Sequence, residues 1–280
     1  MSRFSLGILA ALALASAPSR AAAQVFLYED WSGGAISPNR WRGGVPFLGF
    51  DSGLESQRAV RGGQLVMSVR QAADAAGAGR AAMNVLELAE PAAVTTLRAR
   101  LNVREFTLGP TCAPGSPGGS EVDVLLILTT FKDGAPTATG DRTNDVVAGV
   151  FAFRGQDPNN QSGPDALNVH GIVFKCGDAA CAQFAGIAGA REAHVGVVAT
   201  GTPFRPRVTW DEAGDRFLFG LDDSADVPID YGALGVTDTA APGKHLAALA
   251  VSASSAGCWN NASVKAAFDE IRTNVPAIVP

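Results

Sequence analysis

Several kinds of residue are scarce in this 280-residue sequence, and each shortage excludes a class of protein. Charged residues make up only 18% of the chain, the formal net charge is −5, and no run of Lys or Arg occurs. A mildly acidic chain of this kind lacks the basic patch that attracts nucleic acids and anionic membrane surfaces. We therefore expect neither of them as a partner.

Long hydrophobic runs are missing as well. After residue 23, no segment approaches the roughly 18 unbroken apolar residues that a transmembrane helix needs. The N-terminus has the parts of a secretory signal peptide, namely Arg3, the apolar stretch 6–15 and the small residues 21–23. We expect cleavage before Gln24, which leaves residues 24–280 as a secreted or periplasmic mature chain.

Cysteine is rare, with four residues in the whole chain. In an exported protein, four cysteines most simply form two disulfides. Cys176 and Cys181 enclose only four residues, which suits a local bridge, and Cys112 would then pair with Cys258. A zinc site is the alternative, but the sequence has no C-x-x-C pair and its three histidines are scattered.

Helical periodicity is also lacking, whereas alternation of period two is common. The clearest example is the stretch 203–223, in which the polar link 211–215, with Gly214 for a tight reversal, separates two alternating runs. The apolar members of these runs are Val208 and Trp210, then Phe217, Phe219 and Leu221. This pattern predicts an antiparallel hairpin with one buried face.

The same reasoning predicts strands along the rest of the chain. They cover residues 25–30, 57–60, 64–70, 84–88, 94–106, 121–131, 145–154, 169–175, 194–200, 246–253 and 262–273. The strand at 121–131 is apolar on both faces from Val124 to Leu128, which places it centrally in a sheet. Many short strands, Gly/Pro-rich connections and no internal repeat favour one all-β domain, an antiparallel β-sandwich, over residues 24–280.

Four local patterns resemble the concanavalin A-like lectin/glucanase jelly rolls, which include laminin-G domains and glycoside hydrolase family 16. They follow one another in family order: Tyr28–Gly33 with Ile36–Trp41, Val60–Met67, Thr209–Asp211 with Phe217–Phe219, and Ala267–Arg272. The resemblance implies a jelly-roll sandwich and a polysaccharide or glycoconjugate as partner.

A catalytic motif of the resembling family is incomplete here. Family 16 hydrolases carry E-x-D-x-E or E-x-D-x-x-E on one strand, whose period of two points the acids into one cleft. Glu121 and Asp123 match the first two positions, but Leu125 and Leu126 occupy both possible positions of the third acid. Leucine can neither protonate a leaving group nor activate water, so the standard mechanism is not expected. Glu121 and Asp123 then either contact a ligand or are solvated residues at the start of a strand.

Other residues are candidates for glycan chemistry or glycan binding. Jelly-roll lyases need a base beside neutralising Arg or Gln side chains, and His170 is the candidate base, although a lone His at the start of a strand is more often structural. Sugar binding needs exposed aromatic rings beside polar side chains. Trp41 and Trp259, the latter followed by Asn260, have that composition.

The resemblance also implies a structural calcium ion. In the family, an acid in the first strand, a carbonyl near the second hairpin and an Asp in the last strand often meet, and the matching positions are Asp30, Gly63 and Asp269. Such oxygen donors suit Ca²⁺. Together, these observations predict an exported sandwich that binds a glycan without catalysis. The alternatives are a hydrolase or lyase with a non-standard active site, and a structural envelope or adhesion protein.

Overall fold

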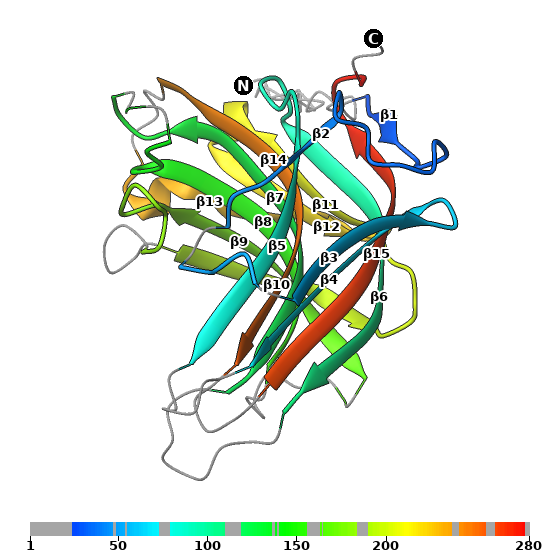
Figure 1. Ribbon diagram of the computed structural model, residues 1–280. Helices are drawn as coiled ribbons and strands as arrows, with labels where there is room; N and C mark the ends of the chain where they lie inside the picture. Colours follow the sequence, from blue (N-terminus) through cyan, green and yellow to red (C-terminus); the bar gives the residue numbers. More distant parts are fainter. Residues whose placement is uncertain are drawn as a thin grey trace, which may run out of the picture.

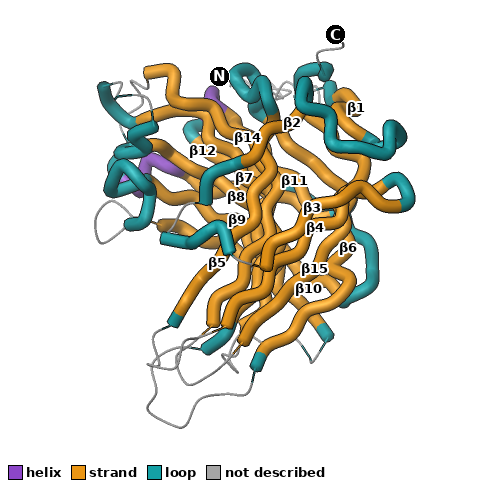
Figure 2. Tube along the Cα trace, viewed as in Figure 1, coloured by secondary structure: helices purple, strands orange, loops and turns teal. Residues whose placement is uncertain are grey.

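The computed structural model describes residues 24–46, 49–53, 55–72, 79–109, 119–135, 138, 140–155, 163, 165–183, 190–236, 241–255 and 261–277. Two antiparallel sheets pack face to face in this part of the chain (Figure 1). Strands dominate the described residues, whose helical segments are two short 3-10 turns, Glu212–Gly214 and Tyr231–Leu234 (Figure 2). Within these residues, no helix is long and apolar enough to span a membrane.

Sheet A has eight strands. In spatial order they are β13 (Val227–Asp230), β12 (Arg216–Leu221), β11 (Pro206–Asp211), β6 (Thr96–Leu108), β15 (Asn261–Thr273), β4 (Gln64–Ala72) and β3 (Glu55–Arg61), with β1 (Phe26–Glu29) paired to β15.

Sheet B has seven strands. Their order is β10 (Ala190–Ala199), β9 (Ala166–Lys175), β8 (Asp145–Gly155), β7 (Glu121–Lys132), β14 (Ala241–Ser255), β5 (Arg80–Leu88) and β2 (Trp41–Gly43). The strand β7 is central, as its two apolar faces predicted.

The core between the sheets follows from the period-two alternation of the strands. On β6, every second residue from Leu97 to Val103 is at most 2% exposed, namely Leu97, Ala99, Leu101 and Val103. The side-chain amide of Asn84 on β5 crosses the interface and donates from Nδ2 to the carbonyls of Gln57 (2.9 Å) and Ser68 (3.2 Å) on sheet A. The alternation of apolar residues therefore determines which face of each sheet is internal.

The hairpin predicted at 203–223 is confirmed as β11 and β12, in which Trp210 pairs with Phe217. The position of the reversal differs from the prediction. The link forms a 3-10 turn, and the left-handed residue is Asp215 (φ 51°) rather than Gly214. Aspartate tolerates this region better than most residues with a side chain.

Trp41 is not the exposed aromatic that the sequence suggested. Its side chain is 2% exposed and stacks on Trp31, with 5.2 Å between ring centroids, while Tyr28 packs edge-on at 5.6 Å. Its indole N–H donates to Glu29 Oε2 at 3.3 Å. A buried ring offers no face to a sugar, so this correction assigns Trp41 to the packing of the N-terminal strands.

The bridge between Cys176 and Cys181 is confirmed. Both residues are buried, at 0% and 1% exposure. Cys112 and Cys258 lie outside the described residues, so their pairing stays a prediction.

Candidate functional site

The outer face of sheet B, which points away from sheet A, carries the residues of the incomplete motif. Val122, Val124, Leu126 and Leu128 alternate into the core between the sheets. The other side of β7 therefore presents Glu121, Asp123 and Leu125, and Leu125 belongs to a separate apolar cluster on that side. Of the two positions open to a third acid, the one that shares a face with Glu121 and Asp123 is thus a leucine that is 1% exposed.

A second apolar layer fills the middle of this outer face. Its buried members are Met83, Val85, Leu125, Ile127, Val147, Phe151, Phe174, Cys176, Cys181, Ala248 and Ala250. Phe50, in the segment before β3, packs on this layer. Backbone hydrogen bonds of Asp51 with Ala81 (2.9 Å) and Met83 (2.8 Å) hold that segment against β5. The layer separates a polar cluster at one end of the face from a cavity at the other.

We call the polar end the acid–histidine cluster, and it consists of Glu121, Asp123, Phe153, His170, Glu192, His194 and Ser252. Strand register explains part of it. Asp123 on β7 lies opposite Ser252 on β14 and Phe153 on β8, and His170 on β9 lies opposite His194 on β10. The cluster therefore spans five adjacent strands of sheet B.

Two acids of the cluster, Asp123 and Glu121, have raised pKa values. Burial raises the pKa of Asp123 well above its usual value, the charge of Glu121 adds to this, and a 2.5 Å hydrogen bond from Ser252 Oγ opposes it in part. Burial and the charge of Glu192 raise the pKa of Glu121. Glu121 is nevertheless an exposed residue.

His170 is the hub of the histidine side. Its Nε2 lies 3.3 Å from Nδ1 of His194, Glu192 contacts its Nδ1, and the ring of Phe153 meets it edge-on at 4.9 Å. Burial lowers its pKa, the Glu192 carboxylate raises it, and His194 lowers it again, with a net lowering. The lowered pKa favours the neutral imidazole, in which one ring nitrogen is an acceptor.

Sequence reasoning identified Glu121, Asp123 and His170 but missed His194 and Glu192. Glu192 lies two residues before His194, but the strand predicted over 194–200 began at His194, whereas β10 begins at Ala190. Their position opposite His170 depends on the register of β9 and β10, which shifts between His194 and Gly196. Trp259 and Asn260 lie outside the described residues.

The pH dependence of stability is a first testable consequence. Between the ordinary pKa of an aspartate and the raised pKa of Asp123, the native state holds more protons than the unfolded state, so stability falls as pH rises through this window. Asp123→Asn removes the buried charge and keeps an acceptor for Ser252. We expect a higher melting temperature at neutral pH, on the order of 2–4 °C for about 1 kcal/mol, and a flatter profile towards acid.

The check is thermal melting of the wild type and Asp123→Asn across mildly acidic to neutral pH. A constant difference between the two proteins at every pH would contradict a buried aspartate with a raised pKa.

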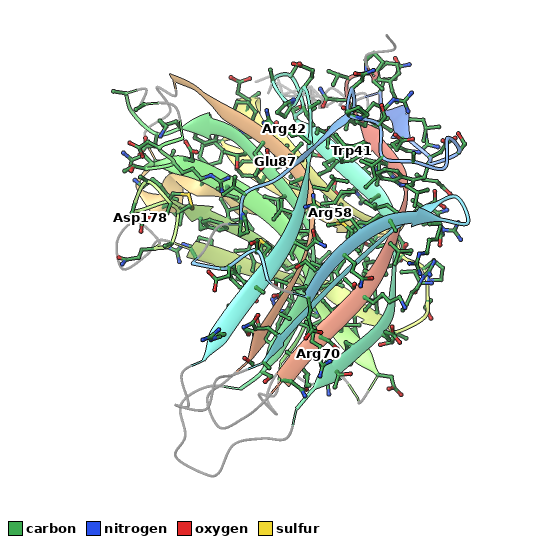
Figure 3. The ribbon with its side chains drawn as sticks, viewed as in Figure 1. Trp41, Arg42, Arg58, Arg70, Glu87 and Asp178 are labelled. Atoms are coloured by element: carbon green, nitrogen blue, oxygen red, sulfur yellow. A yellow bond between two sulfur atoms is a disulfide. The ribbon has the colours of Figure 1, made fainter. Side chains whose placement is uncertain are left out.

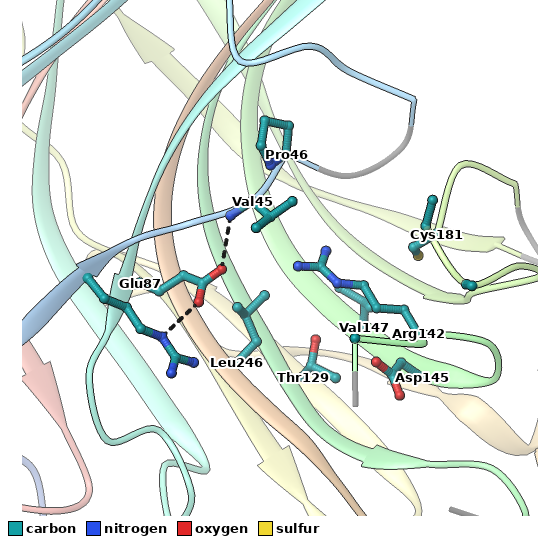
Figure 4. Close-up of a pocket in the computed structure, with 13 residues that line it drawn as sticks. Val45, Pro46, Glu87, Thr129, Arg142, Asp145, Val147, Cys181 and Leu246 are labelled. Carbon is teal, nitrogen blue, oxygen red and sulfur yellow. Dashed lines mark hydrogen bonds and ion pairs between the residues drawn. The ribbon is translucent and has the colours of Figure 1, made fainter. Parts of the chain in front are cut away.

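At the other end of the outer face lies a cavity of about 260 Å³ (Figure 4). Glu87 on β5 accepts from Arg42 Nε at 3.0 Å and from the backbone N–H of Val45 at 3.3 Å, which ties β2 and the following chain over the sheet (Figure 4). Figure 3 shows Arg42 and Glu87 within the whole molecule. Thr129, Arg142, Val147 and Leu246 complete much of its wall. The cavity is mixed in polarity and is separate from the acid–histidine cluster.

The residues predicted to bind calcium have other contacts. The carboxylate of Asp30 accepts from the backbone N–H of Ser32 at 3.0 Å, and Asp269 lies 3.7 Å from Arg100. Among the described residues, no group of three or more His, Cys, Asp or Glu side chains is arranged to hold a metal ion. An ion at Asp269 would compete with the guanidinium of Arg100, and the site at Asp30, Gly63 and Asp269 stays a prediction.

The chain resembles known proteins in its fold. No protein-family model matches the chain, and no match was found among curated proteins. The catalytic domain of an endo-1,3-beta-glucanase (laminarinase) from Thermotoga petrophila RKU-1 is 15% identical, with a TM-score of 0.50 over 89% of this chain and 96% of that one.

Two further solved structures are similar. The laminarinase catalytic domain from Thermotoga maritima MSB8 is 14% identical, with a TM-score of 0.51 over 89% of this chain and 97% of that one. The alginate lyase from Klebsiella pneumoniae is 10% identical, with a TM-score of 0.51 over 86% and 97%. At such identities the likeness concerns the fold. The chain has the concanavalin A-like jelly-roll fold, as the sequence patterns predicted.

Proposed function

We propose that this protein binds a polysaccharide or glycoconjugate at the acid–histidine cluster and does not hydrolyse it by the family 16 mechanism. The observation that carries the proposal is the position of Leu125 on the same face as Glu121 and Asp123. Retaining hydrolysis needs two carboxyl groups about 5 Å apart on either side of the glycosidic bond. The third position of the motif is instead packed into an apolar layer.

The cluster has the composition that sugar recognition needs. Phe153 is a half-buried aromatic ring beside Asp123, and such rings stack on the apolar faces of pyranoses. The exposed side chains of Glu121, Glu192 and His194 supply acceptors and donors for hydroxyl groups. The likeness to two laminarinases and an alginate lyase supports a glycan as the ligand.

The test is a glycan array of neutral and acidic polysaccharides, followed by calorimetric titration of the best ligand. We expect Phe153→Ala and Glu121→Gln to weaken binding at least tenfold, because each removes a contact on the outer face of sheet B. Glu105→Gln is the matched control, since Glu105 is an exposed acid on sheet A that pairs with Lys265 at 3.0 Å. Equal affinities for all three variants, or no binding by the wild type, would refute the proposal.

A second candidate function, β-elimination on an acidic polysaccharide, is favoured by one observation. His170 has a lowered pKa and is oriented by Glu192 and His194, so a neutral imidazole is available to remove a proton next to a uronate carboxylate. Elimination would then expel the oxygen at C4 and leave a C4–C5 double bond that absorbs ultraviolet light. Unsaturated products that form with the wild type and disappear with His170→Ala would favour the lyase over the binding protein.

A further inference from the structure

An arginine hollow lies on the outer face of sheet A, on the opposite side of the sandwich from the acid–histidine cluster. The hollow has a volume of about 250 Å³. Four guanidinium groups and one carboxylate line it, together with Val25 and Ala99, and these charged residues are Arg98, Arg100, Arg205, Arg272 and Glu270. Strands β6 and β15 form its floor, beside β1 and β11 (Figure 1).

Strand register places like charges directly opposite one another in this region. Arg98 on β6 pairs in register with Arg207 on β11 and with Arg272 on β15, which gives three arginines in a row across three adjacent strands. Directly opposed like charges destabilise a sheet. In keeping with this, burial lowers the pKa of Arg98, and the charges of Arg207 and Arg272 lower it further.

Acidic side chains of the protein neutralise only part of the positive charge of these arginines. Arg207 extends across Gly220 and pairs with Asp226 at 2.7 Å, so it is occupied away from the hollow. Arg100 lies 3.7 Å from Asp269 and 3.8 Å from Glu270, and Glu270 also lies 3.9 Å from Arg205. The guanidinium groups of Arg98 and Arg272, in contrast, have no hydrogen-bond or ion-pair partner within the described part of the chain.

The backbone around Glu270 is irregular in a way that builds the hollow. The register between β15 and β6 shifts between Asp269 and Arg272, and Glu270 has a left-handed φ of 46°. Bulges of this type redirect a side chain. Here the bulge brings Glu270 to Arg100 and Arg205 and leaves Arg98 opposite Arg272.

We propose that the arginine hollow binds a dianionic oxyanion, such as a sulfate or phosphate group, between Arg98 and Arg272. Planar guanidinium groups match such oxygen atoms with paired hydrogen bonds. Four cations with a single lining carboxylate suit a dianion better than a monocarboxylate. The bound anion would also relieve the repulsion within the row of arginines. The site is independent of the function proposed above.

The experiment is calorimetric titration and thermal melting of the full mature chain with inorganic sulfate, inorganic phosphate or glucuronate at constant ionic strength, with chloride as the reference. We expect saturable binding of sulfate and phosphate, with weaker binding of glucuronate. Arg98→Gln and Arg272→Gln should each weaken binding at least tenfold. Both variants should melt no lower than the wild type in chloride alone, because each removes a like-charge contact.

Arg70→Gln is the matched control, because Arg70 lies on the same sheet and its guanidinium is 3.6 Å from Glu55. It should bind sulfate as the wild type does. Equal stabilisation of all variants by sulfate would indicate a general salt effect and overturn the proposal. Tighter binding of glucuronate than of sulfate would overturn the assignment to a dianion.

Discussion

Replacing Lys132 by Met is expected to lower the free energy of unfolding by about 3–5 kcal/mol. The ammonium group is 3.1 Å from Asp145 Oδ1, and the two side chains are only 3% and 4% exposed. It also donates to the carbonyl oxygens of Thr143 and Asp141. Removing the cation takes the ammonium charge away from a buried carboxylate and one donor away from each of two carbonyls, which is the costly way to break a buried pair.

Chemical denaturation of Lys132→Met measures this effect, and Lys265→Met is its control. Lys265 forms an ion pair of similar length, 3.0 Å, with Glu105, but those side chains are 40% and 67% exposed. An exposed pair contributes roughly 0–1 kcal/mol. A loss in Lys132→Met no larger than the loss in Lys265→Met would contradict the structural role of the buried pair.

Gly171→Ala is expected to destabilise the protein by about 3 kcal/mol, at the upper end of the usual cost of overpacking. Gly171 on β9 faces Phe219 on β12, and a Cβ built on it would lie 2.2 Å from Cγ of that ring. Phe219 is fully buried between the two sheets. The ring has no room to retreat, so the sheets must separate locally or the ring must leave its rotamer.

Urea unfolding of Gly171→Ala beside Gly232→Ala tests this contact. A Cβ at Gly232 meets no atom within 4 Å, so that variant should keep the wild-type stability. Phe219→Leu should recover part of the stability lost in Gly171→Ala, so the effects of these two substitutions should not be additive. Similar midpoints for Gly171→Ala and Gly232→Ala would rule out the tight contact.

Gly171 also matters for the candidate site, because it directly follows His170. The close approach of β9 to β12 at this point fixes the strand that carries the imidazole. A shift of β9 would move His170 relative to His194 and Glu192. Packing between the sheets and the geometry of the acid–histidine cluster are thus coupled through one short stretch of chain.

Much of the fold could be predicted from the alternation of apolar residues. Alternation identified most of the strands, though not β2 or β13, and it predicted the β11–β12 hairpin and placed Glu121 and Asp123 on one face of β7. The apolar layer that contains Leu125 was harder to predict from the sequence. A strand that is apolar on both faces indicates a central position, but it does not reveal that Phe50 and the Cys176–Cys181 bridge cover the outer side.

Contacts that depend on register or on distant packing were harder to foresee. Trp41 has the composition of a sugar-binding residue, yet the aromatic rings of Trp31 and Tyr28 bury it. The approach of His194 to His170 depends on an irregular register between two strands. The row of arginines likewise emerges only when β11, β6 and β15 are aligned. Local sequence contains no direct signal for any of these three arrangements.

The central claim is that the outer face of sheet B binds a glycan while lacking the carboxyl pair of a family 16 hydrolase. The most direct measurement is the release of reducing ends from a polysaccharide that the protein binds, with β-1,3-glucan included in the panel. We expect the concentration of reducing ends to stay at the level of the protein-free control when the protein is saturated with the polysaccharide. Sustained release by the wild type that is abolished in Glu121→Gln would contradict it.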